Sequence, residues 1–138
     1  MASKKKESNT VAFIIAAVIL LVIYYGSHSS HSQPRVTSNN NEILAKRLAR
    51  EEYHWIGTQW IDLDYLWTRE SGFRIVWNYQ GSGAYGIPQA LPADKMAVEG
   101  PGWQTSAYKQ IQWGLHYIRH RYRNPANAWA HETTYGWY

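Results

Sequence analysis

The chain of 138 residues contains no cysteine, which excludes a disulfide framework and any metal site built from thiolates. The fold therefore does not depend on oxidation, and a location outside the cytoplasm is still allowed. No internal repeat is visible. Excess positive charge is also missing from most of the chain, because residues 36–138 carry ten basic and nine acidic side chains, a balance of +1. We therefore expect one domain and no nucleic-acid partner.

Most of the basic excess lies in the N-terminal flank, where three consecutive lysines precede an uninterrupted apolar run at residues 11–25. With Thr10 and Gly26 the run reaches roughly the lower limit of about 17 residues for a bilayer span. The positive-inside rule places residues 1–10 in the cytoplasm and the rest of the chain outside. A cleaved signal peptide is the alternative, but residues 26–30 lack an A-x-A pattern. We predict an uncleaved transmembrane anchor at residues 11–26.

Residues 27–41 are rich in Ser, Asn and His and contain Pro34. This composition cannot bury a core and predicts a flexible linker between the anchor and a domain at residues 42–138. His28 and His31 have no carboxylate near them, so we interpret them as linker residues. We predict no metal site and no cofactor.

Helical patterns dominate the predicted domain. A first helix is expected from Asn39 to about His54, with Asn39 and Glu42 at capping-box spacing. Gly57 then interrupts the pattern, and Thr58 is expected to cap a helix that runs to about Glu70 and stops at Gly72. Its apolar face consists of Trp60, Leu63, Leu66 and Trp67.

Glu70 falls on the apolar face of this second helix. A carboxylate there is costly unless it is paired or protonated, and desolvation would raise its pKa into the range that suits a general acid. The alternative is that Glu70 pairs with Arg69 or Arg74, or simply lies at the rim of the apolar face. Glu70 is therefore a candidate catalytic residue.

Residues 73–89 no longer have a helical pattern of apolar residues. Residues 73–77 are β-branched and aromatic, and Gly81, Gly83 and Gly86 follow closely, which predicts irregular backbone with a small hairpin. The glycine spacing is not a phosphate-binding signature. Gln89, at the end of this loop, is expected either to contact a ligand or to bond to the loop backbone.

The C-terminal third again predicts helices. A short helix is expected at residues 90–98, and Thr105 is expected to cap a longer one that ends near Tyr122. The basic side of that long helix is interpreted as a solvated face, with attraction to anionic wall polymers as the alternative. Asn124 followed by Pro125 predicts the cap and first residue of a last short helix. We therefore predict a mainly α (α+β) domain with a small irregular β/loop region.

Three motifs in this order resemble a known family. They are Trp67-Thr68-Arg69-Glu70-Ser71-Gly72, then Gly83-Ala84-Tyr85-Gly86-Ile87-Pro88-Gln89-Ala90-Leu91-Pro92, then Gln112-Trp113-Gly114-Leu115-His116-Tyr117-Ile118. Together they resemble the catalytic domain of soluble lytic transglycosylases, which share a fold with goose-type lysozyme. The compact actinobacterial type is most similar, because it has Gly-Ile-Pro-Gln and ends in Gly-Trp-Tyr. The resemblance covers roughly residues 45–138 and implies a lysozyme-like fold.

The resemblance also implies roles for individual residues. Glu70 matches the catalytic acid/base, Ser71 the serine that helps to hold the substrate, and Gly86 and Gln89 the loop that contacts the sugar chain. The family's Ala-Tyr-Asn motif is replaced by Ala128-Trp129-Ala130, so its tyrosine hydroxyl must come from elsewhere, for which Tyr85 and Tyr117 are candidates. The predicted site consists of Glu70 as the catalytic residue and, for the substrate, Ser71, Tyr85, Gly86, Gln89, Tyr117 and Trp129.

The implied activity is cleavage of the β-1,4 bond between N-acetylmuramic acid and N-acetylglucosamine in peptidoglycan, with formation of a 1,6-anhydro sugar. Most other glycosidases need a second carboxylate, and no strong candidate is evident among Asp62, Asp64, Asp94 and Glu99. In the family, the substrate's own acetamido group is thought to assist. A hydrolytic muramidase of the same fold and a non-catalytic peptidoglycan-binding module are the alternatives.

The implied setting is a single-pass membrane protein with its catalytic domain outside the cytoplasm. The expected partners are peptidoglycan glycan strands and, through residues 11–26, the lipid bilayer. A bacterial enzyme of cell-wall remodelling and a phage virion protein that pierces the wall during entry are equally compatible with this organisation. In the phage setting, other membrane or capsid proteins are expected partners.

Overall fold

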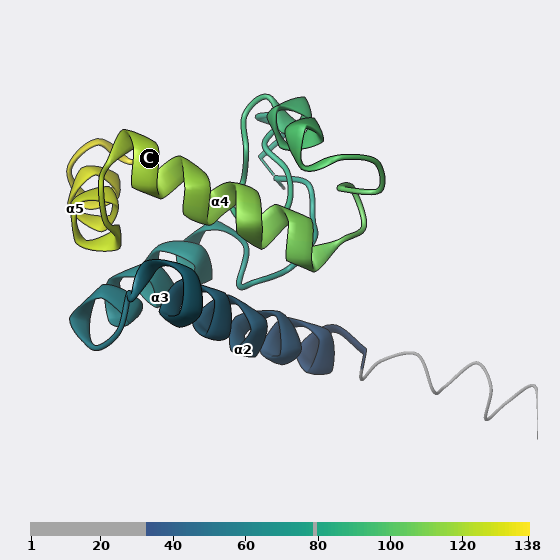
Figure 1. Ribbon diagram of the computed structural model, residues 1–138. Coiled ribbons are helices and arrows are strands. Elements are labelled where there is room, and N and C mark those ends of the chain that lie inside the picture. Colours follow the sequence, from purple (N-terminus) through teal and green to yellow (C-terminus); the bar gives the residue numbers. More distant parts are fainter. Residues whose placement is uncertain (1–32, 79) are drawn as a thin grey trace, which may run out of the picture. The chain divides into compact units, whose positions relative to one another are not determined.

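A computed structural model describes residues 33–78 and 80–138, and residues 35–138 form one compact unit. Within the described ranges the chain is mainly α-helical, as predicted, and has five helices and no strand. The helices are α2 (Gln33–Tyr53), α3 (Thr58–Glu70), the 3-10 helix η2 (Ala93–Glu99), α4 (Ala107–Arg121) and α5 (Pro125–Tyr135) (Figure 1). The predicted anchor at residues 11–26 lies outside these ranges, and none of the described helices is long and apolar enough to cross a membrane.

Helix α2 begins earlier than its sequence pattern suggested. The expected start at Asn39 is wrong, because the helix begins at Gln33 and includes residues 33–41 of the predicted linker. Pro34 lies in the first turn, where a missing N–H group costs no helical hydrogen bond. Asn41 is buried, and its side-chain amide donates a 2.9 Å hydrogen bond to the carbonyl of Phe73. The C-terminal part of the predicted linker is therefore helical, and its last residue, Asn41, packs against the domain.

Helix α3 (Thr58–Glu70) ends at Glu70, as predicted. Its N-cap is Gly57, with no side-chain capping bond, so the prediction that Thr58 is the cap is wrong by one residue. The predicted apolar face is confirmed, because Trp60, Leu63, Leu66 and Trp67 are the buried residues of the helix.

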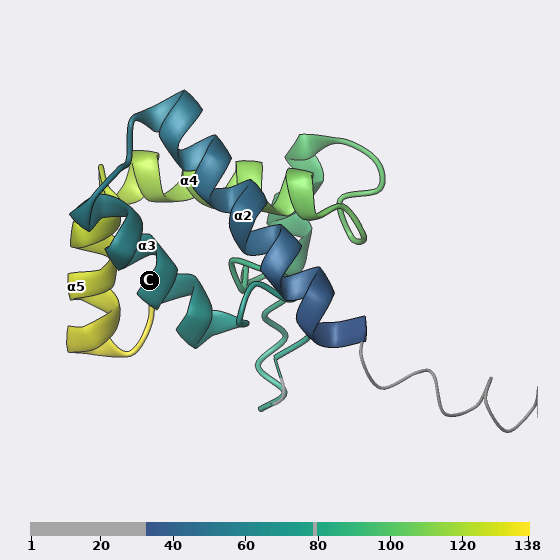
Figure 2. The same ribbon diagram turned by 90° about the horizontal axis from the view of Figure 1, so that it is seen from below.

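Helix α4 crosses the molecule (Figure 1) and has an apolar side that is buried. Ile111, Leu115 and Ile118 on this side are completely buried. Helix α3 packs against α5, and α4 packs against both η2 and α5. In the view of Figure 2, α2 passes in front of α4. The main core lies between these helices and consists of Ala45, Leu48, Ala49, Trp55, Trp60, Leu63, Leu66, Trp67, Phe73, Ile87, Ile111, Leu115, Ile118, Tyr122 and Ala128.

The N-caps of α4 and α5 were predicted from single residues, and one of the two predictions is confirmed. Ser106, not Thr105, is the N-cap of α4, and its side chain accepts a bond from the N–H of Lys109. Asn124 caps α5 as predicted, with Pro125 as the first helical residue. The short helix expected at residues 90–98 is the 3-10 helix η2, shifted toward the C-terminus.

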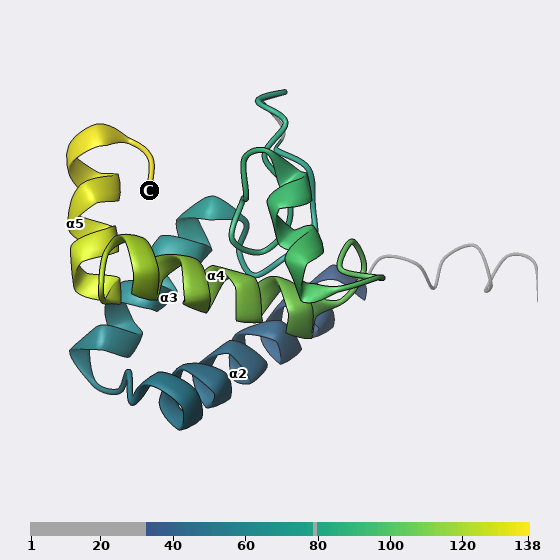
Figure 3. The same cartoon turned by 45° about the horizontal axis from the view of Figure 1, so that its top comes forward.

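The described residues between α3 and η2, 71–78 and 80–92, form no strand. The predicted hairpin is reduced to two isolated antiparallel bridges, from Tyr85 to Trp77 and from Tyr85 to Ala90. At the other end of the chain, the segment after α5 turns back from the end of that helix (Figure 3). Contacts of Tyr138 bring this C-terminal segment against Trp67 of α3 and Pro88 of the loop.

Candidate active site

The C-terminal end of α3 places Glu70 at the edge of the core. Gly72 has a φ of +61°, a left-handed conformation that glycine adopts without strain and that commonly ends helices. Its N–H donates to the carbonyls of Trp67 and Thr68, at 3.0 Å each. The helix therefore stops just after Glu70, and its last turn projects this carboxylate from the border of the buried face.

Glu70 is half-buried and lies in a setting that favours its neutral form. Burial, as the largest cause, and the negative charge of Glu132 raise the pKa of the Glu70 carboxyl from 4.5 to about 7, although Arg69 opposes the shift. No hydrogen bond or ion pair joins the Glu70 carboxyl to another residue of the described ranges. A carboxyl group with this pKa is able to give and to take a proton near neutral pH.

The two arginines that were alternative partners for Glu70 are engaged elsewhere. Arg69 forms a 3.0 Å ion pair with Glu132 of α5, whose side chain is almost completely buried. Arg74 donates a 2.8 Å hydrogen bond to the carbonyl of Ser71. Neither arginine neutralises Glu70 directly, so the pairing alternative does not describe this site. Sequence reasoning missed Glu132, because nothing local links α5 to the end of α3.

Tyr138 is the second residue that sequence reasoning missed. Its hydroxyl accepts a 2.9 Å hydrogen bond from the indole nitrogen of Trp67 and donates one of 2.8 Å to the carbonyl of Pro88. Burial, and then the nearby charge of Glu70, raise the pKa of the Tyr138 phenol well above its ordinary value. The phenol therefore keeps its proton at neutral pH. A possible signal was the aromatic end of the chain, Gly136-Trp137-Tyr138, which entered only as part of the family resemblance.

The glycine-rich loop approaches the helices closely at Gly86. Its φ is +82°, and a Cβ atom there would lie 2.5 Å from Oε1 of Gln110. That same oxygen accepts a 3.0 Å hydrogen bond from the N–H of Ile87. The N–H of Gly86 itself donates 2.8 Å to the carbonyl of Val76. Gly86 thus has a conformational role in shaping the loop, and it is buried.

Of the two roles considered for Gln89, the structure shows the bond to the loop backbone, and contact with a ligand stays a prediction. Its side-chain amide donates to the carbonyls of Val76 and Gly86, at 3.1 and 2.8 Å, so it does bond to the loop backbone. It also lines the pocket described below. Its Oε1 atom is buried and has no hydrogen-bond partner within the described structure, and its φ of +50° is unusual for a side chain larger than glycine. Such an unsatisfied acceptor is costly without a ligand.

Ser71 is buried rather than presented to a ligand. Its hydroxyl donates a 2.8 Å hydrogen bond to the carbonyl of Ile87 and accepts one from the N–H of Arg74. Ser71 is not among the residues that line the pocket. It ties the end of α3 to the glycine-rich loop, and so contributes to the site by fixing the two segments on either side of Glu70.

The three predicted aromatic residues lie in different places. Tyr117 of α4 lines the pocket, and its ring meets that of Tyr138 edge-on at 5.9 Å. Tyr85 does not line the pocket, and its hydroxyl donates to the carbonyl of Gln104 at 2.6 Å. Trp129 packs against Tyr65, with ring centroids 5.8 Å apart, and is also absent from the pocket lining. Of the three, only Tyr117 is placed to meet a ligand beside Glu70.

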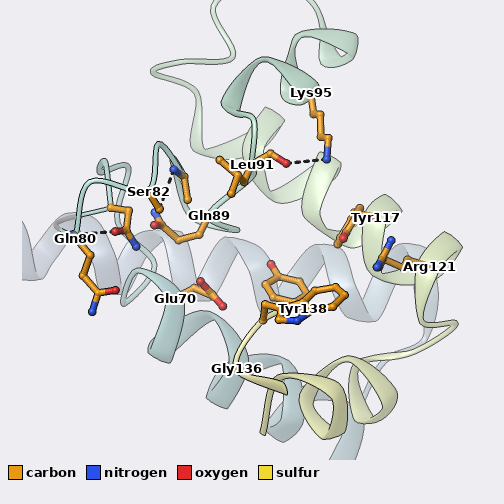
Figure 4. Close-up of a pocket in the computed structure, with 13 residues that line it drawn as sticks. Glu70, Gln80, Ser82, Gln89, Leu91, Lys95, Tyr117, Arg121, Gly136 and Tyr138 are labelled. Atoms are coloured by element: carbon orange, nitrogen blue, oxygen red, sulfur yellow. Dashed lines mark hydrogen bonds between the residues drawn. The ribbon is translucent and has the colours of Figure 1, made fainter. Parts of the chain in front are cut away.

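These segments enclose a pocket of about 500 Å³, with Glu70 on one side and α4 on the other (Figure 4). Among the described residues, Glu70 is the only carboxylic side chain in its lining. A smaller pocket of about 60 Å³ adjoins it and shares Gln89, Leu91, Lys95, Tyr117 and Tyr138. Besides Glu70, the larger pocket is lined by Asn78, Gln80, Ser82, Ala84, Gln89, Leu91, Lys95, Tyr117, Arg121, Gly136, Trp137 and Tyr138.

The lining suits an uncharged or anionic polar molecule with apolar faces, because amides, hydroxyls and aromatic rings surround one acid. Within residues 33–78 and 80–138, no three His, Asp or Glu side chains are grouped so that they could hold a metal ion. Comparisons of the chain with protein-family models, with curated proteins and with solved structures found no match.

Proposed function

We propose that residues 42–138 form a lysozyme-like domain with the activity of a peptidoglycan lytic transglycosylase. The observation that carries the proposal is the setting of Glu70, a half-buried carboxyl group with a pKa of about 7 and the only acidic side chain in the lining of a pocket of about 500 Å³. With this pKa both protonation states are populated near neutral pH. One group is thereby able to act first as an acid and then as a base.

In the proposed reaction, protonated Glu70 gives its proton to the glycosidic oxygen while the bond from that oxygen to C1 of N-acetylmuramic acid breaks. The N-acetylglucosamine side leaves with a new hydroxyl group. The Glu70 carboxylate then takes the proton of the muramic acid 6-hydroxyl as this oxygen bonds to C1. The product is a 1,6-anhydro sugar, Glu70 regains its proton, and no water is consumed.

The absence of a second acid from the pocket lining favours this scheme over one with two carboxylates. Retaining and inverting glycosidases place a second carboxylate about 5–9.5 Å from the first. Glu132 is the acid whose charge raises the pKa of Glu70, but it is 3% exposed, pairs with Arg69 and does not line the pocket. Glu132 is therefore poorly placed to attack a sugar or to activate a water molecule.

Tyr138 brings to the pocket a hydroxyl that Trp129 lacks, but within the described structure this hydroxyl donates to the carbonyl of Pro88 and not to Glu70. Its phenol lies close enough to Glu70 for the carboxylate charge to raise the pKa of Tyr138, and it lines the same pocket. The bonds of this hydroxyl to Trp67 and Pro88 fix its position. In the proposed enzyme, Tyr138 is a positioning residue that keeps the pocket wall beside Glu70 in place.

The proposed location follows from the N-terminal sequence. Residues 11–26 would anchor the chain in the bilayer, with residues 1–10 in the cytoplasm and the domain facing peptidoglycan. The biological setting is either cell-wall remodelling or wall penetration by a phage virion. Fractionation decides between these two settings: the protein is expected in the cell envelope in the first case and in purified virions in the second.

The test of the activity is digestion of purified peptidoglycan by the full chain in detergent, followed by mass spectrometry of the soluble fragments. We expect anhydro-muramic products from the wild type and none from Glu70→Gln. Glu51→Gln, which alters an exposed acid of α2, is the matched control and is expected to retain activity. Products with reducing ends would replace the proposal with a hydrolytic muramidase. Glycan binding without any cleavage would replace it with a binding module.

A further inference from the structure

Two cationic side chains line the pocket on the side away from Glu70. Lys95 belongs to η2 and Arg121 is the last residue of α4 (Figure 4). Within the described part of the chain, neither forms an ion pair with a carboxylate. Glu70, the only acid in the lining, is partly neutral near pH 7 because burial raises its pKa. The charged side chains among the described residues that line the pocket therefore sum to a positive value.

Arg121 is positioned by aromatic rings rather than by an acid. Its guanidinium carbon lies 5.3 Å from the ring centroid of Trp137, 5.6 Å from that of Tyr122 and 6.0 Å from that of Tyr117. Its Nε atom donates a 3.1 Å hydrogen bond to the Tyr122 hydroxyl. Contacts of this kind hold the planar group in one orientation. The hydrogen bond uses Nε, and no hydrogen bond of the two terminal nitrogens is found within the described structure. These two nitrogens are the pair that binds a carboxylate in fork geometry.

Lys95 is held in a similar way by the backbone. Its ammonium group donates a 2.7 Å hydrogen bond to the carbonyl of Leu91, four residues earlier. An ammonium group has three donor hydrogens, so two are left for other acceptors. Lys95 lines both the larger pocket and the smaller one that adjoins it. A surface lysine is usually just solvated, but this one is tethered at the mouth of the pocket that contains the candidate catalytic acid.

We propose that Lys95 and Arg121 form a carboxylate subsite that selects acidic over neutral sugar chains, an inference that rests on the proposed function for the identity of the chain. Two sources of carboxylate exist in peptidoglycan. One is the lactyl group of a muramic acid without a peptide, and the other is a peptide attached to that lactyl group. The first has its negative charge on the lactyl group beside the sugar ring, and the second has it on the peptide farther from the ring, whereas a polymer of N-acetylglucosamine alone has none.

The test measures binding by calorimetry, with the full chain in detergent and Glu70→Gln to prevent turnover. The ligands are a peptide-free hexasaccharide of alternating N-acetylglucosamine and N-acetylmuramic acid, the same hexasaccharide with its lactyl groups amidated, a peptide-bearing hexasaccharide, and the neutral hexamer of N-acetylglucosamine. We expect the acidic hexasaccharides to bind about tenfold more tightly than the amidated one at low salt. The difference should shrink as salt is added.

Arg121→Gln and Lys95→Gln, each added to Glu70→Gln, are expected to remove most of this preference and to leave the affinity for the neutral hexamer within about twofold. Arg119→Gln is the control, because Arg119 is an exposed arginine of the same helix that does not line the pocket. It should keep the preference. If the peptide-bearing ligand binds more tightly, the carboxylate that the subsite binds belongs to the peptide. If the peptide-free ligand binds more tightly, that carboxylate is the lactyl group.

Equal affinity for acidic and amidated hexasaccharides would overturn the subsite, and so would a preference that survives both substitutions. This outcome is separable from failure of the proposed function. The activity fails if the chain with Glu70 intact releases no anhydro products, whereas the subsite is judged by binding alone. A chain that discriminates acidic ligands through Arg121 but does not cleave them would retain the subsite and lose the activity.

Discussion

The indole nitrogen of Trp67 donates a 2.9 Å hydrogen bond to the hydroxyl of Tyr138, a residue 71 positions later in the chain. The same hydroxyl donates to the carbonyl of Pro88 at 2.8 Å. One phenol thus joins α3, the glycine-rich loop and the C-terminal segment, which are the three segments around Glu70. A buried hydroxyl with both a donor and an acceptor satisfied is well suited to hold a site rigid.

Tyr138→Phe is expected to destabilise the protein by about 1–3 kcal/mol, because it leaves the Trp67 N–H and the Pro88 carbonyl without their partner. The free energy of unfolding can be measured by urea denaturation. Tyr135→Phe is the matched control, since Tyr135 is exposed and its hydroxyl has no hydrogen bond within the described structure. Equal stability of the two variants would show that the Tyr138 hydroxyl contributes nothing. Cleavage of peptidoglycan by Tyr138→Phe should also fall.

Local sequence signals predicted α3 well. The apolar spacing of Trp60, Leu63, Leu66 and Trp67 and the stop at Gly72 were sufficient to place Glu70 at the end of a buried face. Glycine, capping residues and helical periodicity act over a few residues, so one sequence reveals them. The N-terminal part of α2 was missed because the sequence there is rich in Ser and Asn, and this composition is also typical of a flexible linker.

The surroundings of Glu70 were not predictable in the same way. Tyr138 and Glu132 reach the site through contacts between segments far apart in the chain, and no local pattern encodes such contacts. Motif correspondence pointed to Trp129, yet its ring packs against Tyr65 outside the pocket lining. Ser71 was expected to help hold the substrate, but its buried hydroxyl donates a hydrogen bond to the carbonyl of Ile87 and so has a structural role.

The raised pKa of Glu70 predicts how stability changes with pH. The folded protein holds the Glu70 proton more tightly than the unfolded chain, because the pKa rises from 4.5 to about 7 on folding. The favourable contribution is therefore complete below pH 4.5 and is lost as the pH rises through 7. Its size is at most about 3 kcal/mol, and solvent screening reduces it.

Glu70→Gln removes this dependence, so the variant should gain stability relative to the wild type between pH 4 and pH 8. The measurement is a series of denaturation curves for both proteins over that range, and the difference between them cancels the other titrating groups. Glu51→Gln serves as the control with an exposed acid. A wild-type to Glu70→Gln difference that is flat with pH would show that Glu70 titrates normally.

The negative charge of Glu132 is expected to raise the pKa of the Glu70 carboxyl. Glu132→Gln removes a negative charge that raises the pKa of Glu70 and releases Arg69, which lowers it. Both effects act in the same direction, so the pKa of Glu70 should fall below 7. Carbon-13 NMR titration of the Glu70 carboxyl measures this without any assay of activity. If the proposed activity holds, the alkaline limb of its pH profile should move to lower pH by the same amount.

The exposed acid Glu51 provides the comparison, and Glu51→Gln should leave the Glu70 titration unchanged. An unchanged pKa in Glu132→Gln would contradict the coupling between the two carboxyl groups. A pKa that rises would mean that loss of the ion pair lets α5 close further over Glu70, so that burial outweighs charge.

Gly114 of α4 lies where that helix meets Trp67. A Cβ atom at this position would lie 2.6 Å from Cζ2 of Trp67 and 3.0 Å from Cβ of Pro88. Alanine is favoured over glycine inside a helix by about 1 kcal/mol, but a clash with two buried neighbours costs about 1–3 kcal/mol. We expect the cost of the clash to exceed the gain in helix propensity, so that Gly114→Ala lowers the free energy of unfolding in urea denaturation.

His120→Ala, on the exposed side of α4, is the control and should be neutral or stabilising. Because Trp67 also bonds to Tyr138, a displaced indole should lower the activity as well, and a more stable Gly114→Ala variant would mean that the contact relaxes freely.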